Sequence, residues 1–247
     1  MATVVAEGER VVRLAEIRAA GLVRHASEHG DRDSVERSLP VAAGLRPLIP
    51  GGHLRRGSTV AVAPGSTSLL LALLAEASAA GSWCAVVGLP HLGLVAAAEA
   101  GVAVNRLALV PNPGPEWASV TAALLDGVDI VVAVPPGPVA PQVSARLTAR
   151  ARQRGGVLVP IGGWPGADLT LELVGGAWHG LGQGRGRLRR REVEVVAHGR
   201  GAATRARRAH LWLPDVRVDL GPVRVVGDQL TLIGPSPAKR EREVGAA

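Results

Sequence analysis

The sequence predicts an α/β fold whose mostly parallel, twisted sheet carries helices on both faces and antiparallel strands at its C-terminal edge. Three observations support this prediction. Short apolar runs recur along the middle of the chain, as expected of strands that are buried on both faces. Helix-length segments separate these runs, which indicates parallel strands joined by crossovers. After Gly166 the helical segments stop and glycine-rich turns follow, which favours antiparallel additions.

Residues 1–38 are predicted to be an N-terminal helix and a linker. Between Glu9 and Ser27 apolar side chains recur at helical spacing, with arginines largely opposite. Residues 28–38 contain four acids and two arginines without apolar periodicity. That pattern is typical of an exposed, mobile segment.

Residues 39–213 are predicted to form the core domain. Strands are expected at Thr59–Ala63, Cys84–Gly88, Arg106–Val110, Asp129–Val134, Val157–Ile161, Leu169–Val174 and Arg189–Ala197. Helices are expected at Leu69–Ala80, Leu92–Ala100, Trp117–Leu125 and Val143–Gln153. Residues 214–247 are predicted to hold further strands at Val216–Leu220, Val223–Val226 and Gln229–Ile233, and then a disordered tail from Gly234.

The composition argues against several classes of protein. A single cysteine, Cys84, excludes an internal disulfide and any multi-cysteine metal site, and its apolar neighbours indicate a small buried residue. The histidines, among them His53, His91 and His179, show no ligand spacing, so neither a metal nor another cofactor is expected. The N-terminus lacks the pattern of a signal peptide, and no apolar run is long enough to cross a membrane. A cytoplasmic location is therefore expected.

The net charge of +7 is concentrated in one short stretch. Residues 185–208 contain nine arginines and two acids. Three interpretations stay open: a solvated strand face, a surface for an acidic protein partner, and a surface for a nucleic-acid backbone. The last is the least favoured, because stacking aromatics are nearly absent. Trp178 and Trp212 flank the stretch, and Trp212 is equally consistent with a core position. The candidate partner-binding residues are Arg189, Arg190, Arg191, Arg205, Arg207, Arg208 and Trp212.

The segment after the strand at 59–63 has the layout of a phosphate-binding loop without its lysine. Pro64, Gly65, Ser66, Thr67 and Ser68 lead directly into an apolar helix. A nucleotide loop needs glycines, a lysine for the phosphate charge and a hydroxyl for Mg²⁺, but Lys239 is the only lysine in the chain. We expect a structural turn in which Ser66 or Thr67 caps the helix, with weak anion binding as the alternative.

Two stretches carry a resemblance to a known family. Residues 45–57 (LRPLIPGGHLRRG) resemble the segment that leads into the Walker A strand of RecA-like proteins, and residues 190–199 (RREVEVVAHG) resemble a late core strand of RecA. Over residues 39–213 the chain is similar to the ImuA-prime branch, the RecA-like accessory proteins of mutagenic repair cassettes. The resemblance implies a RecA-like core.

The chain departs from the RecA pattern wherever that pattern performs chemistry. Ala133 stands where the resemblance places the Walker B aspartate, and no carboxylate lies in 88–91, where the catalytic glutamate is expected. The two DNA-binding loops are replaced by 135–138 (PPGP) and 162–166 (GGWPG), which carry no basic residue. Together with the missing lysine, these losses predict a protein that is not an ATPase.

The resemblance implies a catalytically silent adaptor in damage-induced (SOS) translesion synthesis. Such an adaptor binds an ImuB-like homologue of Y-family polymerases and supports an error-prone C-family polymerase, and it is nucleoid-associated when engaged. The helix at 9–27 is a candidate for self-association. Alternatives are a weak nucleotide-binding switch using Gly65 and Ser66, a DNA-binding factor using Arg189–Arg191, and a SulA-like cell-division inhibitor. Residues 229–233 (QLTLI) resemble a sliding-clamp peptide, but the flanking alternation favours a hairpin.

Overall fold

A computed structural model describes residues 38–182, 185–213, 223–226 and 229–232. The helix expected at 9–27, the linker before residue 38, the strand expected at 216–220 and the tail after residue 233 lie outside the described residues. The fold of the protein is therefore that of residues 38–182 and 185–213, with two short strands farther along the chain.

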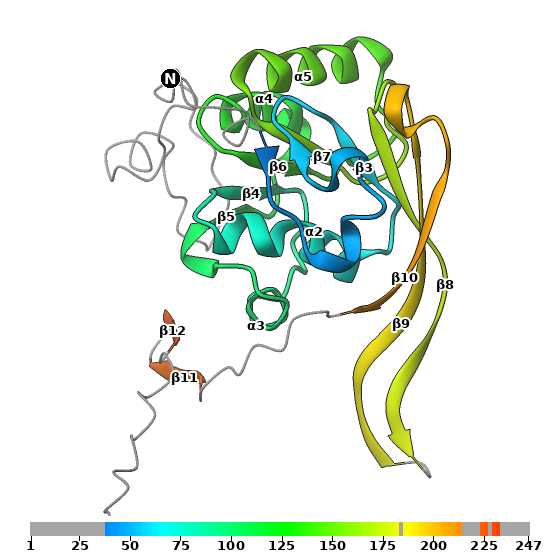
Figure 1. Ribbon diagram of the computed structural model, residues 1–247. Coiled ribbons are helices and arrows are strands. Elements are labelled where there is room, and N and C mark those ends of the chain that lie inside the picture. The colour runs from blue at the N-terminus through cyan, green and yellow to red at the C-terminus, as the bar shows by residue number, and fades with distance from the viewer. Residues whose placement is uncertain (1–37, 183–184, 214–222, 227–228, 233–247) are drawn as a thin grey trace, which may run out of the picture.

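A mixed sheet forms the centre of the protein (Figure 1). One half has the order β5-β4-β6-β7, all parallel, and the other has the order β3-β8-β9-β10. Two parallel bridges, Thr59 to Leu158 and Val62 to Ile161, join β3 to β7, so that the halves are continuous. The strands are β3 (Val60–Val62), β4 (Cys84–Val87), β5 (Leu107–Val110), β6 (Ile130–Ala133), β7 (Val157–Pro160), β8 (Leu169–Gly182), β9 (Arg185–Gly199) and β10 (Arg207–Leu213).

Helices cover both faces of this sheet. Helices α2 (Thr67–Ala79) and α3 (Leu94–Glu99) pack on one face, and α4 (Trp117–Leu124) and α5 (Pro141–Arg154) pack on the other (Figure 1). Successive residues of the strands point to opposite faces. Cys84 and Val86 accordingly belong to the core under α2, whereas their neighbours Ala85 and Val87 belong to the core under α4 and α5.

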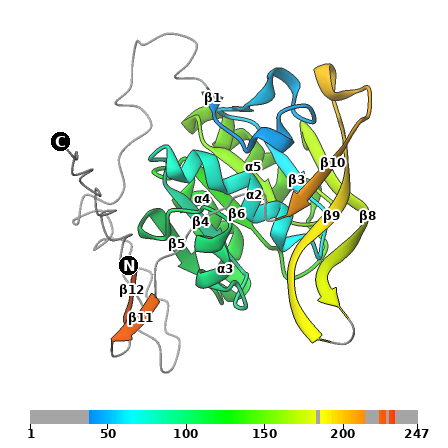
Figure 2. The same cartoon turned by 60° about the horizontal axis from the view of Figure 1, so that its bottom comes forward.

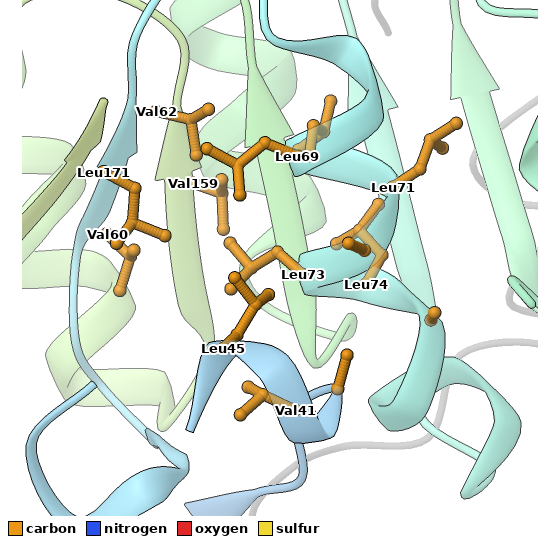
Figure 3. Packing of buried hydrophobic residues seen from close by; sticks show 14 of the residues in the cluster. Val41, Leu45, Val60, Val62, Leu69, Leu71, Leu73, Leu74, Val159 and Leu171 are labelled. Carbon is orange, nitrogen blue, oxygen red and sulfur yellow. The ribbon is translucent and has the colours of Figure 1, made fainter. Parts of the chain in front are cut away.

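The segment before β3 wraps around α2. It contains β1 (Ser38–Leu39) paired with β2 (Leu54–Arg55) and the short 3-10 helices Ala43–Leu45 and Pro50–Gly52. Figure 3 shows Val41 and Leu45 of this segment beside Leu73 and Leu74 of α2. The sheet and this lead-in segment together enclose α2. A helix that is covered on nearly all sides needs apolar residues on nearly all sides, which the sequence LLLALLA provides.

The predicted fold class is confirmed. Each strand predicted up to residue 161 and each helix predicted between residues 69 and 153 is present, with ends that differ by about two residues or fewer. One prediction was wrong in direction, because β8 was expected to be an antiparallel addition and pairs parallel with β3. The connection from β7 to β8 contains no helix. It crosses the face of the sheet that α5 covers, where Trp164 donates a hydrogen bond to Thr148 of α5.

Two further strands differ from the prediction. Strands β8 and β9 are much longer than expected and pair with each other as far as Gly182 and Arg185. Strand β10 was not predicted at all, although its sequence alternates. Farther along the chain, β11 (Val223–Val226) and β12 (Gln229–Leu232) pair antiparallel with Val226 opposite Gln229, which confirms the hairpin interpretation over the clamp peptide.

Candidate functional site

The loop at the carboxyl end of β3 is too short to wrap a phosphate chain. Only residues 63–66 separate β3 from α2, whereas a phosphate-binding loop spans eight residues with two glycines. Gly65 makes the turn with φ 76°. Ser66 stands at the N-cap position of α2, as predicted, but its hydroxyl makes no capping hydrogen bond, because its φ and ψ of −107° and 45° are not those of an extended cap.

Neighbouring strands end at the same edge, and their loops bring almost no charge to it. The loops after β3, β4, β6 and β7, residues 63–66, 88–93, 134–140 and 161–167, contain no lysine, arginine, aspartate or glutamate. His91, which is exposed, is their only ionisable side chain. Ala133, in the position expected for a Walker B aspartate, is fully buried. Ligands of parallel sheets usually bind at this edge, but these four loops supply no lysine, arginine or carboxylate to match a triphosphate with Mg²⁺.

The aspartates nearest these strands lie at the opposite edge and hold the fold together. Asp129 precedes β6; it forms an ion pair with Arg56 at 2.8 Å and accepts the Trp83 backbone N–H at 2.8 Å. Asp168 precedes β8 and accepts the Thr59 backbone N–H at 2.9 Å. Both carboxylates are therefore structural. Within the described residues, no group of three or more His, Cys, Asp or Glu side chains is placed to hold a metal ion.

Cys84 is not suited to nucleophilic chemistry. It is fully buried in β4. Burial, with the nearby charge of Asp129 as a smaller contribution, raises the pKa of its thiol to about 12. The thiol is therefore protonated at neutral pH, and Cys84 behaves as a small core residue, as predicted.

A second candidate surface is the antiparallel ribbon formed by β8, β9 and β10. Beyond β3 these strands extend as a curved arm past α2 and α3 (Figures 1 and 2). One face of the ribbon joins the core through Val193, Val195, Leu211 and Leu213. The alternate residues form the opposite face, which we call the ribbon face. It comprises His179, Glu192, Glu194, Arg208, His210 and Trp212.

Trp212 is the large apolar group of the ribbon face. Its side chain is 38% exposed, and its ring meets that of His179 edge-on, with centroids 4.8 Å apart. Val174, 54% exposed, lies at a bulge of β8. Tryptophan is enriched among the few residues that contribute most to binding at protein interfaces, so Trp212 is a candidate anchor.

Cross-strand pairs partly neutralise the ribbon face. Arg208 bonds Glu194 at 2.9 Å, and His179 lies 3.9 Å from Glu192. On the same ribbon His198 lies 3.8 Å from Glu172. An exposed ion pair such as Arg208–Glu194 contributes only about 0.2–1 kcal/mol, so it orients side chains more than it stabilises the fold.

The structure divides the predicted arginine stretch among separate places. Arg191 is half-buried in β9 opposite Leu213, and Arg205 is exposed in the turn before β10. Arg207 is half-buried at the start of β10, whereas Arg208 and Trp212 lie on the ribbon face. Arg189 and Arg190 belong to β9, but their side chains lie outside the described part of the structure. The five described members of the predicted set therefore do not form one patch.

Sequence reasoning missed the acidic and histidine members of the ribbon face. Glu192 and Glu194 were counted only as acids within a basic stretch, and His210 was not singled out. The alternation in residues 207–213, with apolar side chains at 209, 211 and 213, was the available signal for a half-buried strand.

None of the described helices combines the length and apolar character that a bilayer crossing requires.

Comparisons with known proteins identify relatives of part of the chain. The family described as "MT3502 N-terminal domain" matches residues 47–166. The uncharacterized protein Rv3395c of Mycobacterium tuberculosis (strain ATCC 25618 / H37Rv) is 42% identical over 127 residues, which are 50% of this chain and 62% of that protein. The chain thus spans less than two thirds of the length of this relative.

Among solved structures, the RadB recombinase superposes with a TM-score of 0.48 at 15% sequence identity. The superposition covers 68% of this chain and 92% of the RadB chain.

Proposed function

We propose that this chain is a non-catalytic, RecA-like adaptor that binds other proteins. One observation carries the proposal: the edge of the parallel sheet where nucleotide chemistry is performed presents no charged side chain after β3, β4, β6 or β7. Without a cation the γ-phosphate charge has no partner, and without a carboxylate neither Mg²⁺ nor an attacking water is held.

The ribbon face is the proposed docking surface. It offers an exposed tryptophan with polar groups around it, on an arm that extends past α2 and α3 (Figure 2). Interfaces of this kind combine an aromatic anchor with a polar rim that fixes orientation. The short loops at the carboxyl edge, by contrast, are rich in proline and glycine and provide little that is specific for a partner.

The resemblance to the ImuA-prime branch suggests the partner. In this proposal the chain acts in damage-induced translesion synthesis, binds an ImuB-like homologue of Y-family polymerases and supports an error-prone C-family polymerase. Residues 45–57 and 190–199 support the RecA-like part of this proposal, and the polymerase partners are what the resemblance to the ImuA-prime branch implies.

The test is equilibrium binding of the full chain to the purified polymerase homologue, with and without ATP and Mg²⁺. Trp212→Ala should weaken binding about 30-fold, the loss typical of an interface anchor. Val95→Ala is the matched control, because Val95 is 46% exposed but lies on α3. Equal affinity of Trp212→Ala and the intact chain would overturn the proposed surface. Binding that requires ATP would favour the nucleotide switch instead.

A further inference from the structure

Five of the described arginines lie at the end of the sheet opposite to the conventional ligand edge. Arg55 lies in β2 just before β3, Arg152 and Arg154 lie in the last turn of α5, and Arg200 and Arg205 lie between β9 and β10. All five are exposed. They lie at the edge of the sheet where the parallel strands begin, and we call them the amino-edge arginines.

Direct contacts bring three of these elements together around the start of β3. The Gly57 N–H donates to the Gly156 carbonyl at 3.0 Å, and a Cβ on Gly57 would lie 3.2 Å from the Cα of Arg152. The Arg200 N–H donates to the Asp168 carbonyl at 3.0 Å, and Asp168 in turn bonds the Thr59 N–H. Arg55, Arg152 and Arg200 therefore surround one short stretch, residues 57–59.

Three described aspartates lie near this edge, and each is already engaged; Asp168 accepts the Thr59 backbone N–H. Asp129 pairs with Arg56, and Asp126 pairs with Arg150 and Arg154. Arg55, Arg152, Arg200 and Arg205 form no ion pair with any residue that the structure describes. The edge consequently has an excess of positive charge that the described residues do not neutralise.

Helix α5 differs from an ordinary solvated helix face. It carries four arginines and no acid in 14 residues. Arg146, Arg150 and Arg154 are spaced four apart, so like charges adjoin along one stripe, which costs a few tenths of a kcal/mol per pair in an isolated helix. The other described α-helices contain no arginine. The charge of α5 is therefore a local feature and not a property of all surfaces of this arginine-rich chain.

We propose that the amino-edge arginines bind the phosphate backbone of a nucleic acid. Guanidinium groups match phosphate oxygens in a bidentate geometry. The described large hydrophobic side chains that are exposed are Val95, Leu109, Val174 and Trp212, and none belongs to this edge. A protein interface needs an apolar centre, whereas backbone binding to nucleic acid needs only charge and donors. Because none of the described large hydrophobic side chains that are exposed lies at this edge to stack on bases, we expect binding to be independent of sequence.

The test measures binding of the full chain to a fluorescent 30-nucleotide strand and a 30-base-pair duplex, by anisotropy over a range of salt concentrations. The variant Arg55→Gln, Arg152→Gln, Arg200→Gln should bind the preferred probe at least tenfold more weakly at low salt. The slope of its plot of log affinity against log salt concentration should be smaller in magnitude by about 2–3, because each lost phosphate contact reduces that slope by about 0.7–0.9.

The comparison variant, which serves as the control, is Arg189→Gln, Arg190→Gln, Arg191→Gln, which removes the same charge from the stretch of β9 that is the alternative DNA-binding surface. Retention of affinity by the control and loss by the first variant supports the proposal. Three results overturn it: no binding of either probe by the intact chain, equal losses in both variants, or loss of a polypeptide partner by the first variant while nucleic-acid binding persists. Circular dichroism of the same variants shows whether a loss of binding comes from unfolding. The binding assay with the polymerase homologue, run on the same variants, shows whether the adaptor function fails independently of this site.

Discussion

Arg56 and Asp129 form an ion pair across the amino edge of the sheet. Arg56 Nη1 lies 2.8 Å from Asp129 Oδ1, and the other carboxylate oxygen accepts the backbone N–H of Trp83. Asp129 thus ties together the lead-in segment, β4 and β6. Asp129 precedes β6 and lies at the end opposite to Ala133, the position at which the resemblance to RecA places a metal-binding aspartate, and its contacts are structural.

Substitutions at Asp129 should show this role through stability. Asp129→Ala removes the ion pair and leaves the Trp83 N–H without its acceptor, so we expect a loss of about 2–3 kcal/mol in the free energy of unfolding. Asp129→Asn keeps an oxygen for that N–H and should lose about 1 kcal/mol. Urea unfolding of both variants measures the difference. Unchanged midpoints in both would contradict the structural role.

Asp126 should make stability depend on pH in acid. Burial acts to raise the pKa of this carboxyl, but the hydrogen bonds and charges of Arg150 and Arg154 outweigh burial, so the pKa lies below its usual value. A carboxyl with a lowered folded pKa stabilises the fold above its unfolded pKa of about 3.9, and this contribution disappears as pH falls through the folded value.

Asp126→Asn tests this dependence. At pH 7 the variant should be less stable by about 0.5–1 kcal/mol, because the two pairs are partly exposed. The difference from the intact protein should shrink as pH falls below about 4. Glu116→Gln is the control, since Glu116 forms no ion pair with any described residue, and its offset should not follow this trend. If the difference in the free energy of unfolding between Asp126→Asn and the intact protein stayed constant down to about pH 2.5, the lowered pKa of Asp126 would be refuted.

Two glycines at the carboxyl edge should respond differently to alanine. Gly65 and Gly88 both have positive φ, 76° and 82°. A Cβ on Gly65 meets nothing within 4 Å, whereas one on Gly88 would lie 2.5 Å from the Val134 carbonyl oxygen. Gly65→Ala should therefore lose about 1 kcal/mol from backbone strain alone, and Gly88→Ala clearly more, about 2–4 kcal/mol. Thermal unfolding ranks the two, and the reverse order would contradict the close approach of these loops.

Much of the fold could be predicted from the sequence because the parallel core depends on local pattern. Runs such as 84–87 (CAVV) and 130–133 (IVVA) are apolar at every position, as strands covered on both faces require. The parallel pairing of β8 could not be predicted, because a crossover without a helix leaves no periodic signal. Along this crossover Trp164 makes a tertiary contact with Thr148 of α5, and such a contact between distant segments has no local pattern in the sequence.

The candidate sites were predicted unequally. The loss of the lysine and the shortened loop at 63–66 are visible in the sequence, since they concern adjacent residues. The ribbon face could not be predicted from the sequence, because Trp212, Glu192 and His179 are brought together only by the register of three strands. The amino-edge arginines were missed for the same reason, as Arg55 and Arg200 come from distant segments.

Cys84 should be protected from thiol reagents in the folded protein. Its side chain is fully buried, and the pKa of the thiol is raised to about 12, chiefly by burial. Ellman's reagent at pH 8 should therefore react only at the rate at which the protein opens, and addition of guanidinium chloride should accelerate the reaction by orders of magnitude. Complete modification within seconds under native conditions would contradict the position of Cys84 in the core.

The most direct test of the central claim is equilibrium binding and turnover of ATP with Mg²⁺ by the purified full chain. Because the loops at 63–66, 88–93, 134–140 and 161–167 bring no cation or carboxylate to the phosphates, we expect no saturable binding below about 1 mM and no turnover above the buffer rate. Binding with a micromolar Kd, or hydrolysis, that disappears in Ser66→Ala while the fold is retained would contradict the claim.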